Sequence, residues 1–166
     1  MILSEAPSQR ILGVDPGLRT TGYGVVDFSA GAARLVEAGV ITPKTNGTLE
    51  QRLHELHAGL SAVVAATQPS AMVIEELYTT YRNPLTAILM GHARGVLCLA
   101  GAQCGVPVHT LAHSLVKRAL IGSGAARKDQ VNHMVVQLLG LHRRPQPNDV
   151  SDALALALAF GNRVLR

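Results

Sequence analysis

Aromatic residues are scarce in this 166-residue chain, which has three tyrosines, two phenylalanines and no tryptophan. Leucine, valine, isoleucine and alanine must therefore fill the core. Long hydrophobic runs are missing too. The longest stretch without a polar or glycine residue is 153–160, whereas a membrane-spanning helix needs about 20 apolar residues. We therefore expect a soluble protein without a membrane partner, and its length predicts a single compact domain.

Cysteine is also rare, and the two cysteines, Cys98 and Cys104, lack the paired spacing of a zinc site. We expect both to be reduced, buried thiols within one helix. The N-terminal sequence MILSEAPSQR has no basic start followed by an apolar stretch, so it predicts no signal peptide. These features predict a cytoplasmic protein.

Acidic residues are nearly absent between residues 77 and 148, where Asp129 is the only one. This region carries a net charge of +7, although the whole chain carries +4, because it holds eight basic residues: Arg82, Arg94, Lys117, Arg118, Arg127, Lys128, Arg143 and Arg144. A basic region of this kind suits a polyanion such as nucleic acid, although an ordinary solvated basic face explains the charge equally well.

The pattern of apolar residues predicts an α/β domain. Short β-type runs predict an antiparallel meander followed by two further strands, at residues 11–14, 23–28, 33–41, 71–74 and 106–110. Helical spacing and terminal Gly, Pro, Ser or Asn residues predict five helices, at residues 48–68, 83–102, 113–121, 127–139 and 148–163. This order predicts a three-layer α/β domain, in which helices cover both faces of a mixed five-stranded sheet.

Four acidic residues follow or begin strongly apolar segments. Asp15 and Glu75 each come directly after a strand of buried type, where a carboxylate is costly unless a cation compensates it. Asp149 and Asp152 lie three residues apart at the start of the last helix and therefore share one face. Taken singly, each acid also fits a purely structural role, as an ion-pair partner of an arginine or as a cap of a turn or helix.

Converging carboxylates without a cysteine or histidine cluster form a site of hard oxygen ligands, which suits Mg²⁺ or Mn²⁺ and argues against zinc. Such sites typically act on phosphates. In a two-metal arrangement the ions activate water and stabilise the attacking and leaving oxygens of an in-line displacement. A basic surface around such a centre is what a nuclease needs.

Four motifs in order resemble the RuvC family of bacterial crossover junction endodeoxyribonucleases: VDPGLRTTGYGVV at 14–26, VIEELY at 73–78, GHARGV at 91–96 and DVSDALALALA at 149–159. The resemblance implies a single ribonuclease H-like nuclease domain over residues 10–166, and residues 1–9 are expected to be a disordered extension. It also implies a homodimer that resolves Holliday junctions by paired symmetric nicks during DNA recombination and repair. Two Mg²⁺ ions per active site are expected, with Mn²⁺ able to substitute, and the implied partners are four-way junction DNA and a branch-migration complex of the RuvA and RuvB type.

By the same resemblance, Asp15, Glu75, Asp149 and Asp152 are the four catalytic, metal-binding carboxylates. Glu76 directly follows Glu75 and is a competing ligand, but neighbouring strand residues point to opposite faces, which favours Glu75.

The expected DNA contacts are one aromatic and several basic residues. Tyr78 takes the place of a family phenylalanine that stacks on a DNA base, and Lys117 and Lys128 match basic residues near the scissile strand. The basic region adds Arg82 and Arg118 as further candidates.

Two histidines, His54 and His57, lie one turn apart on the first helix, but no further ligand is nearby in the sequence. We expect both to face solvent.

Oligomerisation is also expected from the residues themselves. Apolar side chains surround most of the helix over 83–102, whereas a monomer's surface helix should show one apolar stripe. We therefore expect a second subunit to cover part of it, and burial in a single larger core is the alternative.

Two other functions compete. The glycine-rich turn from Asp15 to Gly24 resembles the phosphate loop of actin-like ATPases and sugar kinases, although 166 residues are too few for their two lobes. A ribonuclease H-like module that binds branched DNA without cutting it is the second, and the four acids argue against it.

Overall fold

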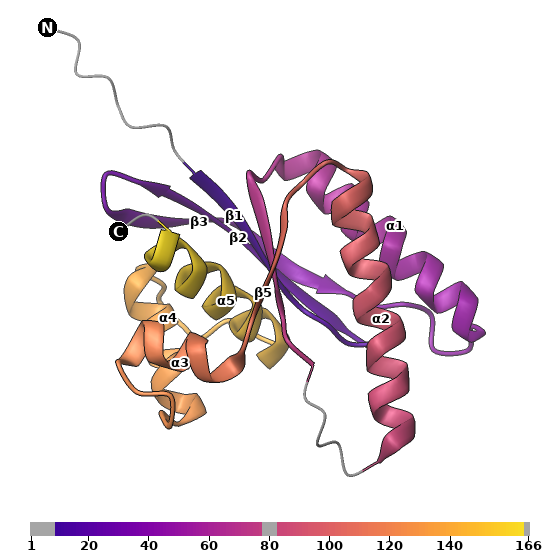
Figure 1. Cartoon of the computed structure of the whole chain (residues 1–166). Coiled ribbons are helices and arrows are strands. Elements are labelled where there is room, and N and C mark those ends of the chain that lie inside the picture. The colour runs from indigo at the N-terminus through magenta and orange to yellow at the C-terminus, as the bar shows by residue number, and fades with distance from the viewer. Residues whose placement is uncertain (1–8, 78–82, 165–166) are drawn as a thin grey trace, which may run out of the picture.

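The computed structural model describes residues 9–77 and 83–164. Five strands form one sheet in the order β3-β2-β1-β4-β5 (Figure 1). The strands are β1 (Gln9–Asp15), β2 (Thr21–Ser29), β3 (Ala32–Ile41), β4 (Ala71–Glu75) and β5 (Val108–Leu111). The first three form an antiparallel meander, and β4 and β5 run parallel to β1. The expected mixed five-stranded sheet is confirmed.

Helices cover both faces of the sheet (Figure 1). On one face lie α1 (Leu49–Thr67) and α2 (Pro84–Gln103), and on the other α3 (His113–Ile121), α4 (Lys128–Leu138) and α5 (Asn148–Val164). Successive strand residues point to opposite faces, so Ile11 joins the buried cluster beneath α5 and Leu12 joins the cluster beneath α1 and α2. The three-layer prediction is confirmed.

Local signals place the ends of several elements. Thr48 and Gln51 form a capping box at the start of α1, and the Asn83 side chain accepts a hydrogen bond from the Leu85 N–H at the start of α2. The strand expected at 106–110 begins at Val108, because the preceding residue is Pro107, which has no N–H for the ladder.

Two expectations about individual residues are wrong. Gln9, assigned to the N-terminal extension, is the first residue of β1 and pairs with Phe28. Cys98 is only half-buried, and Cys104 is exposed at the C-cap position, just past the end of α2 at Gln103. Both thiols are free.

Glycines let α5 lie directly on the sheet. A Cβ atom at Gly13 would overlap the backbone of Ala153, and one at Gly22 would overlap the carbonyl of Asp149. Gly24 similarly faces the side chain of Leu154. Since Gly22 pairs with Asp15 in the β1–β2 ladder, this close contact brings the first turn of α5 against the end of β1.

The substitution Gly22→Ala should lower the free energy of unfolding by about 1 to 3 kcal/mol, because the added methyl group forces α5 away from the sheet. Denaturant unfolding measures this loss. Unchanged stability would show that α5 has room to shift.

Candidate active site

The site is built at the carboxyl ends of two neighbouring parallel strands. In the β1–β4 ladder Val14 pairs with Ile74, so the next residues in register are Asp15 and Glu75. Both follow four-residue buried stretches, and both side chains emerge where the strands end. The sheet thereby places two carboxylates side by side.

The first turns of α5 supply the other two acids. Asp149 lies against Gly22, the ladder partner of Asp15. Val150 and Ser151 are buried, whereas Asp149 and Asp152 keep part of their surface exposed on the side of the sheet edge. The Ser151 hydroxyl donates to Oδ1 of Asn132 at 2.7 Å, which ties α5 to α4.

Electrostatics link Asp15 to the other three carboxylates. Burial raises the pKa of Asp15, and the charges of Glu75, Asp152 and Asp149 raise it further, to about 8, against a smaller lowering by Lys128. All three partner carboxylates therefore lie within electrostatic reach of Asp15. The fold therefore places Glu75, Asp149 and Asp152 around Asp15 at one end of the sheet.

Two of the expected basic residues border this acidic centre. Lys128, at the start of α4, places its Nζ 2.6 Å from Oδ2 of Asp152. Lys117 lines a small hollow together with Glu75, His113 and Asp152. Arg118 is exposed and is not among the residues that line that hollow. Tyr78 and Arg82 lie outside the described residues.

Glu76 does not share the position of Glu75. It lies beyond the end of β4, its side chain is exposed, and its N–H donates to the carbonyl of Leu111 at 3.1 Å. It is also absent from the charges that raise the pKa of Asp15.

Sequence reasoning missed two residues that hold Glu75. Nδ1 of His113 lies 2.9 Å from Oε1 of Glu75. Arg94, within the GHARGV motif, donates from Nε to the Glu75 carbonyl at 2.9 Å and also reaches Oγ1 of Thr110 at 2.7 Å. The signal for His113 was its place just after β5, because this third parallel strand ends at the same sheet edge as Asp15 and Glu75.

The donor chemistry fits a hard divalent cation. All four ligand candidates offer carboxylate oxygens. Burial and the repulsion of Asp15 by the other three acids raise its pKa, and a divalent cation would relieve both penalties. Within residues 9–77 and 83–164, no three His, Cys, Asp or Glu side chains are already gathered as a metal-ligand set. Instead Lys128 binds Asp152 and His113 binds Glu75, so these cationic or hydrogen-donating groups take the carboxylates that a cation would share.

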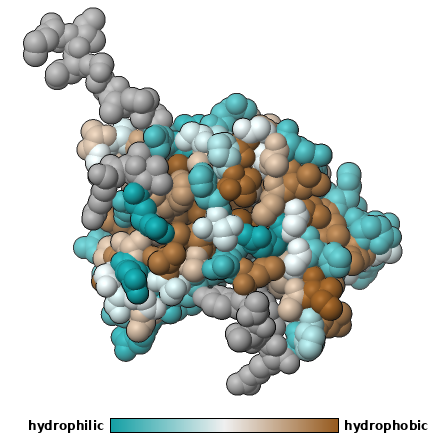
Figure 2. Space-filling model, in the orientation of Figure 1, coloured by the Kyte–Doolittle hydropathy of each residue, from teal (hydrophilic) through white to brown (hydrophobic). Residues whose placement is uncertain are grey.

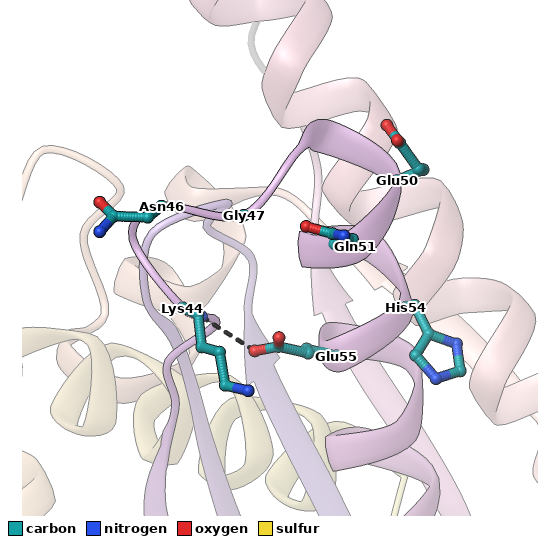
Figure 3. A pocket seen from close by; sticks show the side chains of 7 residues that line it. All are labelled: Lys44, Asn46, Gly47, Glu50, Gln51, His54 and Glu55. Carbon is teal, nitrogen blue, oxygen red and sulfur yellow. Dashed lines mark hydrogen bonds between the residues drawn. The ribbon is translucent and has the colours of Figure 1, made fainter.

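A larger hollow of about 570 Å³ lies between the segment after β3 and the first turns of α1. Figure 3 shows that its polar side chains diverge, with Glu50 and His54 pointing away from Lys44. One hydrogen bond links its two walls, from the Lys44 N–H to Oε2 of Glu55 at 2.9 Å. This hollow gathers no set of groups for catalysis.

The two histidines of α1 behave differently. His54 is exposed as expected. His57 is half-buried and its Nε2 lies 2.6 Å from Oε1 of Gln103 in α2, so the expectation that it faces solvent is wrong. The packing of α1 against α2 determines that contact.

Comparison with known proteins decides the family. The family model of the crossover junction endodeoxyribonuclease RuvC matches residues 11–160. The chain belongs to the RuvC family. A RuvC from Rhodopirellula baltica is 48% identical over 148 residues, which cover 89% of this chain and 83% of the relative. A RuvC from Chloroflexus aurantiacus is 42% identical over 149 residues, 90% of each chain.

Solved RuvC structures have the same fold. The Thermus thermophilus RuvC structure superposes with a TM-score of 0.86 at 34% identity, over 95% of this chain and 96% of that one. The same protein in complex with Holliday junction substrate gives a TM-score of 0.88 at 34% identity, over 94% of each chain. The ribonuclease H-like fold and the expected activity are confirmed, since this RuvC-family chain is a junction-resolving endonuclease of DNA recombination and repair. RuvC-family nucleases depend on metal ions, and membership replaces both competing functions.

Proposed function

We propose that Asp15, Glu75, Asp149 and Asp152 are the catalytic carboxylates, that together they hold two Mg²⁺ ions, and that Mn²⁺ substitutes for Mg²⁺. The observation that carries this assignment is the strand register: Asp15 and Glu75 directly follow Val14 and Ile74, which pair in the β1–β4 ladder. Asp149 lies against Gly22, the ladder partner of Asp15. The pKa of Asp15, raised to about 8 by burial and then by the charges of the other three acids, supports the same assignment. A shared divalent cation would stabilise the ionised form of Asp15 beside the other three acids. The substrate is four-way junction DNA, which is cut by paired symmetric nicks.

The residues of the chain divide the chemistry among them. When bound, the divalent ions activate the attacking water and offset the charge that develops on the phosphate. Asp15 and Glu75 would hold the ions from strand ends, and Asp149 and Asp152 would hold them from α5. Lys128 donates from Nζ to Oδ2 of Asp152 at 2.6 Å, so a positive charge beside the carboxylates would be available to a phosphate oxygen of the substrate.

The basic residues around this centre are proposed to bind the DNA backbone. Lys117 and Lys128 border the carboxylates, and Arg118 lies exposed beside Lys117 on α3. Tyr78 and Arg82 keep their predicted roles in base stacking and phosphate binding, respectively. A Thermus thermophilus relative bound to Holliday junction substrate supports this choice of ligand.

Adjacent glutamates provide a sharp test of the assignment. Glu75→Gln should reduce metal-dependent cleavage of a synthetic four-way junction by more than about 100-fold. This exceeds the loss of about 10- to 100-fold that is usual when a residue that only hydrogen-bonds a metal ligand is removed. Glu76→Gln, the matched control, should cleave as the parent does, because its side chain is exposed beyond the strand. The reverse outcome would show that Glu76 is the ligand. Two fully active variants would refute the four-carboxylate centre.

We further propose that the enzyme is a homodimer formed through α2. By length and composition α2 could cross a membrane, but core helices of soluble proteins meet the same two criteria.

Ile88 and Leu99 are 58% and 50% exposed, and brown side chains reach the surface over this helix in Figure 2. A Cβ at Gly91 or Gly95 would meet nothing within 4 Å. Helix glycines cost about 1 kcal/mol relative to alanine, so these two positions suit close approach by a second helix.

Two-fold symmetry would present two equivalent active sites to a four-way junction. Ile88→Glu should therefore convert the dimer to a monomer and replace paired nicks by unpaired ones, because a charge would be buried between the subunits. Light scattering after gel filtration at micromolar concentration should give about twice 17.5 kDa for the parent and 17.5 kDa for the variant. Leu138→Glu, on the exposed side of α4, should leave the dimer intact. A parent that is monomeric yet makes paired nicks would refute the dimer.

The remaining expectations complete the proposal. The chain from Gln9, the first residue of β1, to residue 166 constitutes one nuclease domain. The enzyme works in the cytoplasm, and a branch-migration complex of the RuvA and RuvB type supplies its junctions. The first of these receives support from the family match over residues 11–160.

A further inference from the structure

His113 occupies a position at the active site that the four acids do not explain. It is the first residue of α3, directly after β5, and Ala112 before it offers no side-chain cap to the helix. Its side chain is 35% exposed beside a Glu75 side chain that is 25% exposed. Together with Lys117 and Asp152 it lines the small hollow next to the carboxylates. The imidazole therefore faces the site and is not a core residue.

The direction of its hydrogen bond follows from the chemistry of the partner. An ionised carboxylate only accepts hydrogen bonds, so Nδ1 of His113 must carry the proton that Oε1 of Glu75 accepts at 2.9 Å. In the described part of the chain, no other side chain donates a hydrogen bond to this carboxylate. Lys117, one turn further along α3, shares the hollow but donates no hydrogen bond to Glu75 in the structure.

The backbone and the side chain of Glu75 are thus held separately. Arg94 donates to its carbonyl from α2 at 2.9 Å, and His113 donates to its carboxylate from the opposite layer of the molecule. The strand ladder and Arg94 fix the position of the Glu75 backbone, and His113 fixes the position of its carboxylate. A glutamate has three rotatable side-chain bonds, so a ligand carboxylate without such a donor would sample several rotamers.

We propose that His113 is a positioning residue that holds the Glu75 carboxylate in one rotamer for the divalent cation shared by the four acids. This inference rests on the proposed function, since it assumes that Glu75 is a ligand. Hydrogen bonds from an outer residue to a ligating group commonly set its orientation, and their removal costs about 10- to 100-fold in metal affinity or activity. His113 itself touches neither the scissile phosphate nor the cation in this role.

The test compares His113→Ala with His113→Asn, two substitutions that differ in whether a side-chain N–H donor remains. The side-chain amide of asparagine places an N–H near the position of Nδ1, whereas alanine places none there. His113→Ala should weaken Mn²⁺ binding, measured by calorimetric titration, by about 10- to 100-fold, and His113→Asn should recover most of that loss. Junction affinity without divalent ions should stay unchanged in both. His133→Ala, at an exposed position on α4, is the matched control and should bind Mn²⁺ as the parent does.

Two further measurements isolate the Glu75 contact. In the Glu75→Gln background, His113→Ala should cause no additional loss of Mn²⁺ affinity, because the group that it positions is already changed. In the metal-free parent, nitrogen NMR of the imidazole at one fixed pH should show a protonated Nδ1 whose resonance moves in Glu75→Gln.

The outcomes separate the two proposals. A parent that binds no Mn²⁺ and does not cut junctions would overturn the proposed function, even if the Nδ1 resonance depends on Glu75. A parent that binds and cuts, with His113→Ala unchanged or with alanine and asparagine equally impaired, would overturn only the role of His113.

Discussion

Asp15→Asn should abolish cleavage of a four-way junction while leaving the fold and junction binding intact. The amide preserves the volume of the side chain but removes a buried carboxylate that lies within electrostatic reach of Glu75, Asp149 and Asp152. Loss of a residue that only hydrogen-bonds a metal ligand costs about 10- to 100-fold in activity. Loss of a ligand itself should cost more, so we expect the cleavage rate to fall by more than about 100-fold. Cleavage with Mg²⁺ and a gel-shift measurement without divalent ions report the two properties separately.

The matched control for this experiment is Asp129→Asn. Asp129 lies on α4 in an exposed ion pair with Arg127 at 3.4 Å, so the same chemical change there removes a charge outside the carboxylate centre. It should leave the rate within a few-fold of the parent. Full activity in Asp15→Asn, or equal losses in both variants, would contradict a centre built on Asp15.

The strand ends explain how much of this site could be predicted from the sequence. Asp15 and Glu75 each follow a run of buried residues, so local patterns place each acid at the end of a strand. Their proximity also requires that β1 and β4 be parallel neighbours, a pairing of distant segments that the structure shows. Asp149 and Asp152 were placed by helical spacing alone. Helical spacing does not predict that α5 packs against β2. That packing brings Asp149 to Gly22 and hence close to Asp15.

Glycines illustrate the limit of local reasoning. Gly22 and Gly24 permit two interpretations in the sequence, a phosphate-binding loop or a strand. In the fold both belong to β2, and each lacks a side chain because α5 lies against it. The place of His113 just after β5 indicates the sheet edge at which it lies, but its contact with Glu75 also depends on the register of β5 against β4 across 38 residues of chain. The exposure of Cys104 depends on where α2 ends.

The second large effect expected is a fall in the stability of the metal-free protein as pH rises. The pKa of Asp15 is raised from its ordinary value to about 8, so between about pH 4 and pH 8 the folded protein holds a proton that the unfolded chain has released. The unfolded state then binds fewer protons, and stability declines by up to about 1.4 kcal/mol per pH unit before it levels off above pH 8. Other groups also titrate in this range, but both the parent and Asp15→Asn contain them. The difference in the free energy of unfolding between the two proteins, followed against pH, therefore reports on the Asp15 carboxyl group.

Divalent cations should reverse this penalty, because a cation competes with the proton for the same carboxylates. Added Mg²⁺ should therefore raise the melting temperature of the parent little at about pH 5 and progressively more toward about pH 8, where Asp15 is released from its proton. In Asp15→Asn the metal-free protein should be more stable than the parent at about pH 8, by roughly 2 to 5 kcal/mol, and the Mg²⁺ increment should be small and nearly independent of pH. Scanning calorimetry with Mg²⁺ and with a chelator measures all four curves. A parent whose stability relative to Asp15→Asn does not change with pH would mean that Asp15 is ionised throughout, and the strained carboxylate centre argued from its burial would be wrong.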